Sequence, residues 1–343
     1  MSVDILKDDI KNNRIKSLYL FYGPEDYLMR HYTGLMEKSL LSEDLKTLNR
    51  VVLEGKAEIN KIRDNCETMP VFSDRKMVIV KNSGLFKPAK KASETTSKKG
   101  KSSGDDLTQL LKDLPDHVCL IFLEQEIDKR LKAVLDTVKK HGLLVEFAFQ
   151  KPEDLVKWVV KKMRSAGVEI DISTASRLVE NCEQGMTEIQ NEVEKLVAYL
   201  EGNGKATIKD VEKVCTKSIK SKVFDLTDAI SEKNSTRALK LLNYMVVLKE
   251  PIPKILFLIA RQFRQILQVK LLQAEGKNTG EIASKLGLMP FIAGKLLKQA
   301  SGFKVEGLKE AMEICLEYDI AVKTGRLEDR TAAELLIIEF SSN

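Results

Sequence analysis

The chain has few of the residues that metal and redox chemistry require. Its 343 residues include only three histidines and five cysteines. His31, His117 and His141 share no metal-type spacing with a cysteine or carboxylate, and no two cysteines are closely spaced. The sequence therefore predicts no metal site, no other cofactor and no disulfide framework, and the cysteines are interpreted as small core residues.

Long apolar runs are also absent. No stretch reaches the roughly 18 uninterrupted apolar residues that a membrane span needs. The first nine residues are mixed and acidic, unlike a signal peptide. These features predict a cytoplasmic protein.

Strongly basic character is confined to parts of the chain. The net charge is +6, but residues 87–104 alone hold six lysines and one glutamate, and residues 216–343 hold 20 basic and 15 acidic residues. The remaining residues carry a net negative charge. The overall charge is therefore weak support for a nucleic-acid groove across the whole protein.

The pattern of apolar runs predicts an α/β module followed by helices. Five short apolar runs separated mostly by helical periodicity indicate a buried, mostly parallel sheet, and they lie at 18–22, 51–53, 77–80, 118–123 and 143–145. Beyond Pro152 the patterns are helical. We expect an α/β domain over 1–150, a small helical domain over 151–216 and a second helical domain over 217–343.

Residues 87–104 interrupt the α/β pattern. They are rich in Ser, Thr, Lys and Gly and have no hydrophobic periodicity. We predict a disordered, solvated surface insertion, in preference to a basic tether that contacts DNA.

The first predicted strand ends at a glycine, as it does in nucleotide-binding proteins. A working phosphate loop needs G-x-x-x-x-G-K-[ST], but Gly23, Pro24, Glu25 and Asp26 are followed by neither a second glycine nor a lysine and hydroxyl residue. The carboxylates would repel phosphates at short range. Glu124, after the fourth apolar run, is interpreted as an exposed, solvated carboxylate. We therefore predict a degenerate phosphate loop and no ATPase or other catalytic site.

Four segments in order resemble signatures of the bacterial DNA polymerase III clamp-loader δ subunits, and together they span most of the chain. Residues 18–28 (LYLFYGPEDYL) are similar to the N-terminal signature and residues 69–80 (MPVFSDRKMVIV) to the second. The third is 280–287 (GEIASKLG) with Pro290 and Phe291, and the last is 323–326 (KTGR) followed by 333–338 (AELLII).

The resemblance implies a degenerate AAA+ (P-loop-like) module, its helical lid and a helical collar domain used for oligomerisation. It implies a non-catalytic subunit of the polymerase III holoenzyme, acting at replication forks. Its partners would be the β sliding clamp, which it opens, the τ/γ and δ′ subunits in a pentameric ring, and primer–template DNA within the assembly. The clamp contact of the family maps onto Met69, Val71 and Phe72. The basic insertion, and Pro70 within the clamp contact, depart from the family pattern.

The residues themselves give the clamp contact some support. Ile59, Ile62, Cys66 and Met69 are spaced to share one helix face, and Pro70 should end that helix. Val71 and Phe72 then fall in a turn, where two adjacent large apolar residues do not usually both point inward. We expect an exposed apolar knob.

A different class of function competes with this one. Residues 279–288 match a helix-turn-helix pattern, which would make the chain a DNA-binding regulator. The helix that follows, 290–299, offers only Lys295, Lys298 and Gln299 as polar residues. That composition favours helix packing over reading base edges.

Overall fold

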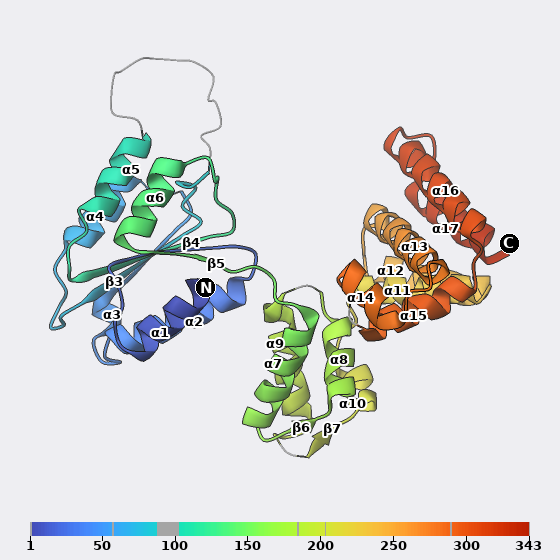
Figure 1. Ribbon diagram of the computed structural model, residues 1–343, viewed down its shortest axis with the longest axis horizontal. Helices are drawn as coiled ribbons and strands as arrows, with labels where there is room; N and C mark the ends of the chain where they lie inside the picture. Colours follow the sequence, from blue (N-terminus) through green and yellow to red (C-terminus); the bar gives the residue numbers. More distant parts are fainter. Residues whose placement is uncertain are drawn as a thin grey trace. The chain divides into compact units, whose positions relative to one another are not determined.

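The structure is a computed structural model that describes residues 2–56, 58–87, 103–183, 185–202, 204–288 and 290–342. The chain divides into two compact units, Met1–Gln150 with Gly185–Thr187, and Lys151–Gln184 with Glu188–Asn343 (Figure 1). The second unit contains both predicted helical domains, so the boundary between them at 216 stays a prediction. Across the described ranges, no helix is long and apolar enough to cross a membrane.

The first unit is built on a five-stranded parallel sheet with the order β2-β3-β4-β1-β5. The strands are β1 (Leu18–Tyr22), β2 (Arg50–Glu54), β3 (Lys76–Lys81), β4 (Val118–Glu124) and β5 (Leu143–Glu146). The inner strands β3 and β4 are buried on both faces, which explains their continuous apolar sequences. The order reverses at β1, so the carboxyl ends of β1 and β4 form the place where such sheets bind ligands.

Helices cover both faces of this sheet (Figure 1). One face packs against α1 (Ser2–Lys11) and α2 (Asp26–Leu40), with α3 (Lys46–Asn49) on the same side. The other face packs against α4 (Ile59–Glu67), α5 (Ser103–Lys112) and α6 (Lys132–His141). Strand residues alternate between the two cores, as the period of a β-strand requires: Leu18 and Leu20 face one, Tyr19 and Phe21 the other.

The second unit is helical. It begins with α7 (Pro152–Ser165), α8 (Ile172–Asn181), α9 (Met186–Tyr199), whose first two residues belong to the first unit, and α10 (Ile208–Val214). It continues through α11 (Ile219–Ser231), α12 (Ser235–Val247), α13 (Ile252–Ala274), α14 (Thr279–Leu286), α15 (Pro290–Ser301), α16 (Val305–Lys323) and α17 (Asp329–Ser342). Two short strands, β6 (Glu169–Ile170) and β7 (Lys205–Ala206), pair in parallel. β6 comes directly before α8 in the chain, and β7 comes directly before α10.

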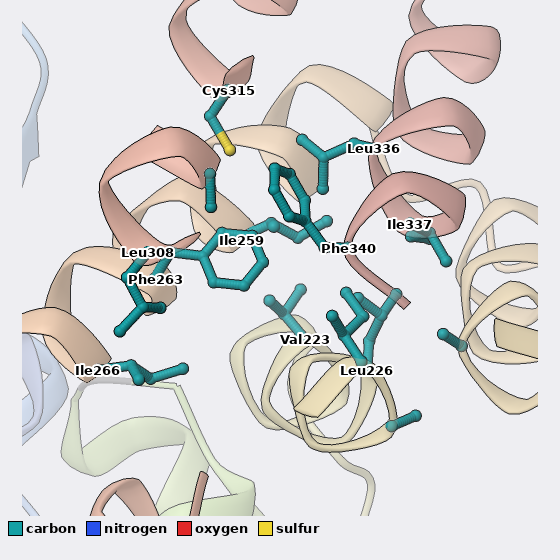
Figure 2. Packing of buried hydrophobic residues seen from close by; sticks show 14 of the residues in the cluster. Val223, Leu226, Ile259, Phe263, Ile266, Leu308, Cys315, Leu336, Ile337 and Phe340 are labelled. Atoms are coloured by element: carbon teal, nitrogen blue, oxygen red, sulfur yellow. The ribbon is translucent and has the colours of Figure 1, made fainter. Parts of the chain in front are cut away.

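The later helices share one core around α13. Phe263 of α13 is fully buried and packs edge-on against Phe303 and Phe340, at centroid distances of 5.9 and 5.5 Å. Figure 2 shows Phe263 and Phe340 meeting with side chains from α11, α16 and α17. This cluster is the hydrophobic core of the helices from α11 to α17.

The predicted fold class, a parallel α/β module followed by helices, is confirmed. All five apolar runs form strands, Thr207 caps α10 with a capping box, and Gly287 ends α14 in the left-handed conformation. The short pair β6–β7 was not predicted. Residues 88–102 of the predicted insertion lie outside the described residues, whereas its last two residues, Ser103 and Gly104, are not disordered but begin α5.

Candidate functional site

The turn after β1 approaches a neighbouring backbone too closely for any side chain. Gly23 has a φ of +132°, and a Cβ placed on it would lie 2.3 Å from the carbonyl oxygen of Phe147. Only glycine fits both the conformation and the space. Gly23, in the turn predicted to be a degenerate phosphate loop, is therefore required for packing against the segment after β5.

Backbone groups of this turn are bonded to the protein itself. The Gly23 N–H donates to the carbonyl oxygen of Glu124 at 3.0 Å, and the Glu25 N–H donates to that of Phe147 at 3.1 Å. In a working phosphate loop, backbone N–H groups point at the anion instead. Because these two N–H groups already donate to carbonyl oxygens of the protein, fewer backbone donors of this turn remain to bind a phosphate.

Glu25 has turned into the protein. It is 1% exposed, and the Met186 N–H donates to its two carboxylate oxygens at 3.2 and 3.1 Å. Burial raises the pKa of the Glu25 carboxyl above its ordinary value, against the opposing effect of hydrogen bonds from the Met186 and Tyr27 backbone. Asp26 instead lies in the first turn of α2 and pairs with Arg30 at 2.6 Å. The two carboxylates of the loop thus have different surroundings.

Glu124 corrects a prediction. It was expected to be exposed and solvated, but it is 1% exposed and accepts hydrogen bonds from the Ser83 N–H at 2.8 Å and the Ser83 hydroxyl at 2.5 Å. Burial raises the pKa of its carboxyl, partly offset by those bonds. The carboxylate is engaged in joining the ends of β3 and β4. The sequence around Glu124 gives no indication that Ser83, 41 residues earlier, is its hydrogen-bond partner.

The apolar turn before β3 is exposed. Phe72 is 89% exposed, Met69 69% and Val71 40%, whereas Pro70 is half-buried. Full burial of a phenylalanine side chain stabilises a fold by roughly 1.5–3 kcal/mol, so this arrangement leaves that stabilisation unused. The exposure of Val71 and Phe72 agrees with the expected knob.

The end of α4 was predicted two residues too late, whereas the exposure of Met69 agrees with its place in the implied clamp contact. Met69 was expected to share a helix face with Ile59, Ile62 and Cys66, but α4 ends at Glu67 and the backbone is already extended at Thr68. Ile62 and Cys66 are buried as expected. Because the helix ends before Met69, its side chain leaves the helical face and joins the exposed turn.

Sequence reasoning missed the residues that hold this turn. Asn49, at the end of α3, is fully buried, and its side chain bonds both backbone groups of Val71. On the other side of the turn, the Ser73 hydroxyl donates to the carbonyl oxygen of Arg75, whose guanidinium donates to that of Ile15 at 2.6 Å. No pattern in the sequence links Asn49 to a residue 22 positions away.

The turn has a strained backbone and an apolar neighbour. Phe72 has a φ of +51°, the left-handed region, which costs a residue other than glycine on the order of 1 kcal/mol or more. Leu48, next to Asn49, is 57% exposed and adds a further apolar side chain on α3. A surface turn with a strained backbone, fixed hydrogen bonds and exposed apolar side chains is typical of a partner site.

The helix-turn-helix pattern does form two helices, α14 and α15, but its polar residues are engaged within the second unit. Gln299 is 1% exposed and accepts from the Gln262 side chain at 3.0 Å. Lys295 pairs with Glu180 at 3.2 Å. Of the three polar residues expected on a recognition helix, Lys298 is the exposed one. These contacts favour helix packing over DNA reading.

Among the residues that the structure describes, no group of three or more His, Cys, Asp or Glu side chains is arranged to hold a metal ion. All five cysteines are free and buried. Their burial agrees with the interpretation of the cysteines as core residues.

The sequence models of two protein families match the chain. The family described as DNA polymerase III, delta subunit, matches residues 19–148, and that described as DNA polymerase III delta subunit, C-terminal domain, matches residues 220–340. The apolar turn of Met69, Val71 and Phe72 and all but Ile219 of the C-terminal helical core fall inside the matched ranges.

Similar proteins match most of the chain. DNA polymerase III subunit delta of Bacillus subtilis (strain 168) is 24% identical over 342 residues, 99% of this chain and 96% of that protein. The probable DNA polymerase III subunit delta of Aquifex aeolicus (strain VF5) is 21% identical over 277 residues, 79% of this chain and 75% of that one. The solved structure of the Bacillus subtilis DNA clamp loader delta protein (YqeN) has a TM-score of 0.57 at 23% identity, with 100% of both chains covered, so the two share a fold.

Proposed function

The chain belongs to the DNA polymerase III delta subunit family, and on that premise we propose that it binds and opens the β sliding clamp as a subunit of the clamp loader. The observation that carries this proposal is the exposed apolar turn of Met69, Val71 and Phe72, held in a strained conformation. An aromatic side chain presented at the tip of a fixed turn is suited to anchor in an apolar pocket of a partner.

The proposed opening of the clamp depends on a difference in binding energy between its open and closed forms. A clamp that is closed by apolar contacts between its subunits opens when a partner binds the open form more tightly than the closed one. The turn is fixed by Asn49 and Arg75 rather than free to adapt. Because the turn is rigid, it can fit one form of the clamp better than the other, whereas a flexible segment would adapt to both forms.

We propose that the chain does not hydrolyse ATP. Two backbone N–H groups of the phosphate-loop turn are bonded to Glu124 and Phe147, and the Glu25 carboxylate is bonded to the Met186 N–H. The segment after Gly23 lacks the lysine that binds phosphate and the hydroxyl residue that binds magnesium in a P-loop. Hydrolysis would then be the work of other subunits.

The C-terminal helices supply faces for those subunits. Leu316 and Ile320, four residues apart on α16, are 60% and 44% exposed, and Leu335 and Ile338 on α17 are 42% and 46% exposed. Residues at this spacing share one helix face. We assign these faces to the contacts with τ/γ and δ′ in a pentameric ring. Primer–template DNA would be held within the assembled ring, in the cytoplasm at replication forks.

Phe72→Ala tests the clamp contact. We expect the affinity of the isolated chain for the sliding clamp to fall by about 2 kcal/mol or more, roughly thirtyfold, as for a central aromatic anchor. Isothermal titration calorimetry would measure it, with circular dichroism to show that the variant is folded. The matched control is Phe257→Ala in α13, because Phe257 is 66% exposed but lies in the other unit. Equal affinities for the Phe72 variant and the unchanged protein would refute the assignment.

A further inference from the structure

A single buried amide fixes the centre of the apolar turn. The Asn49 Nδ2 donates to the carbonyl oxygen of Val71 at 2.8 Å, and the Val71 N–H donates to Asn49 Oδ1 at 2.7 Å. Asn49 Nδ2 also lies 3.2 Å from the carbonyl oxygen of Leu45. The side chain thus bonds Val71 as a neighbouring strand would, through one donor and one acceptor. A side chain that is 0% exposed gives those bonds without competition from water.

The residue that follows cannot hold its own conformation. Phe72 has a φ of +51° and is 89% exposed, so neither backbone preference nor burial of its ring favours the observed geometry. The bonds to Val71 act on the adjacent residue, directly before the strained one. They are therefore placed to keep Phe72 presented in the absence of a partner.

We propose that Asn49 is a positioning residue for clamp binding, which holds the turn of Val71 and Phe72 in its binding conformation before the clamp arrives. This inference rests on the proposed function. Its physical basis is that ordering a flexible segment on binding reduces affinity, and a segment ordered beforehand avoids that loss. Asn49 acts through the turn and needs no contact with the clamp.

Asn49→Ala is the first test. Removal of both bonds should weaken the affinity for the sliding clamp by about tenfold, since the turn must then be ordered during binding. Asn12→Ala is a matched control, because the Asn12 amide donates to the Asp8 carboxylate at an exposed site at 2.7 Å. Thermal melting monitors the fold of both variants. An unchanged affinity for a folded Asn49 variant would overturn the proposal.

Asn49→Asp supplies a second readout, the pH dependence of clamp affinity, in a variant that thermal melting shows to be folded at each pH. At neutral pH the introduced carboxylate can accept from the Val71 N–H but has no proton to donate to the Val71 carbonyl oxygen. When protonated it offers one donor and one acceptor again. The affinity of this variant, relative to that of the unchanged protein at the same pH, should therefore recover as the pH falls. A relative affinity that is constant with pH or falls further would contradict the positioning role.

A double-mutant cycle with Phe72→Ala separates this inference from the proposed function. If Asn49 acts through Phe72, Asn49→Ala should cause little further loss in the Phe72→Ala background. Equal losses in both backgrounds would overturn the role of Asn49 while leaving the clamp contact intact. If Phe72→Ala alone had no effect, the proposed clamp contact would fail and the inference with it.

Discussion

Glu25 shows at the scale of one residue how the ligand end of a parallel sheet can be closed by the protein itself. Its carboxylate is buried and bonded to the Met186 N–H, at the start of α9. A helix start is a favourable place for an anion because its first N–H groups lack partners in the helix. The chain's own carboxylate occupies that place.

Glu25→Gln tests this burial through the pH dependence of stability. The folded pKa of Glu25 is raised above its ordinary 4.5, so the folded state binds a proton more readily than the unfolded state. Glu25 therefore stabilises the protein increasingly as the pH falls from neutral towards 4.5. Glutamine keeps an acceptor for the Met186 N–H but cannot titrate. The free energy of unfolding of the variant, minus that of the unchanged protein, should be largest at neutral pH and decrease as the pH falls.

Urea unfolding at several pH values measures this difference. Glu126→Gln is the control with the opposite sign, because Glu126 is exposed and Lys87 lowers the pKa of its carboxyl. The corresponding difference should be flat or rise as the pH falls. A difference for Glu25→Gln that rises on acidification would show that the buried carboxylate is favoured in its charged form.

The sequence predicted individual residues unevenly. Val71 and Phe72 could be predicted as exposed because two large neighbours in a turn cannot easily share one core. Glu124 and Asn49 could not, because each is buried through a partner that is remote in the chain, Ser83 and Val71. A residue whose environment is set by a long-range hydrogen bond carries no local signal of that bond.

At the scale of elements, periodicity predicted the strands and most later helices because each is long enough for its buried side to repeat. Elements of a few residues were different: β6 and β7 have two residues each, and α3 has four. The end of α4 was also displaced. Its last residue is Glu67 rather than Met69, and that difference of two residues decides which way Met69 points. Element boundaries depend on packing that the local sequence does not report.

The exposed face of α16 gives a prediction at this scale. Substitution of Leu316 and Ile320 by lysine places two charges where we propose an apolar contact with a neighbouring subunit. Burying unpaired charge is costly, so assembly with τ/γ and δ′ should weaken at least about tenfold, which is roughly 1.4 kcal/mol. Size-exclusion chromatography of the reconstituted mixture would detect the loss.

Clamp affinity of the same variant is its control. The substituted residues belong to the second unit, and the apolar turn belongs to the first. Binding of the isolated variant to the sliding clamp should therefore be unchanged. Normal ring assembly by the folded variant would exclude α16 from the subunit contact.

At the scale of the whole molecule, the two ends of the first unit differ in their contacts. The carboxyl ends of β1 and β4, where related folds bind nucleotide, are bonded to the chain itself through Gly23, Glu25 and Glu124. The turn before β3 instead presents Phe72 to solvent. The fold class was predictable from the order of its elements, whereas this division depends on hydrogen bonds that only the folded chain reveals.

The central claim is that this chain grips the clamp by itself and without nucleotide. The most direct test is a titration of purified β sliding clamp with the isolated chain, in the absence and in the presence of ATP and magnesium. We predict the same dissociation constant under both conditions, because we propose that the contact is the fixed turn of Val71 and Phe72 and that the phosphate loop is degenerate. Binding that appears only with ATP, or tightens severalfold when ATP is added, would contradict the account.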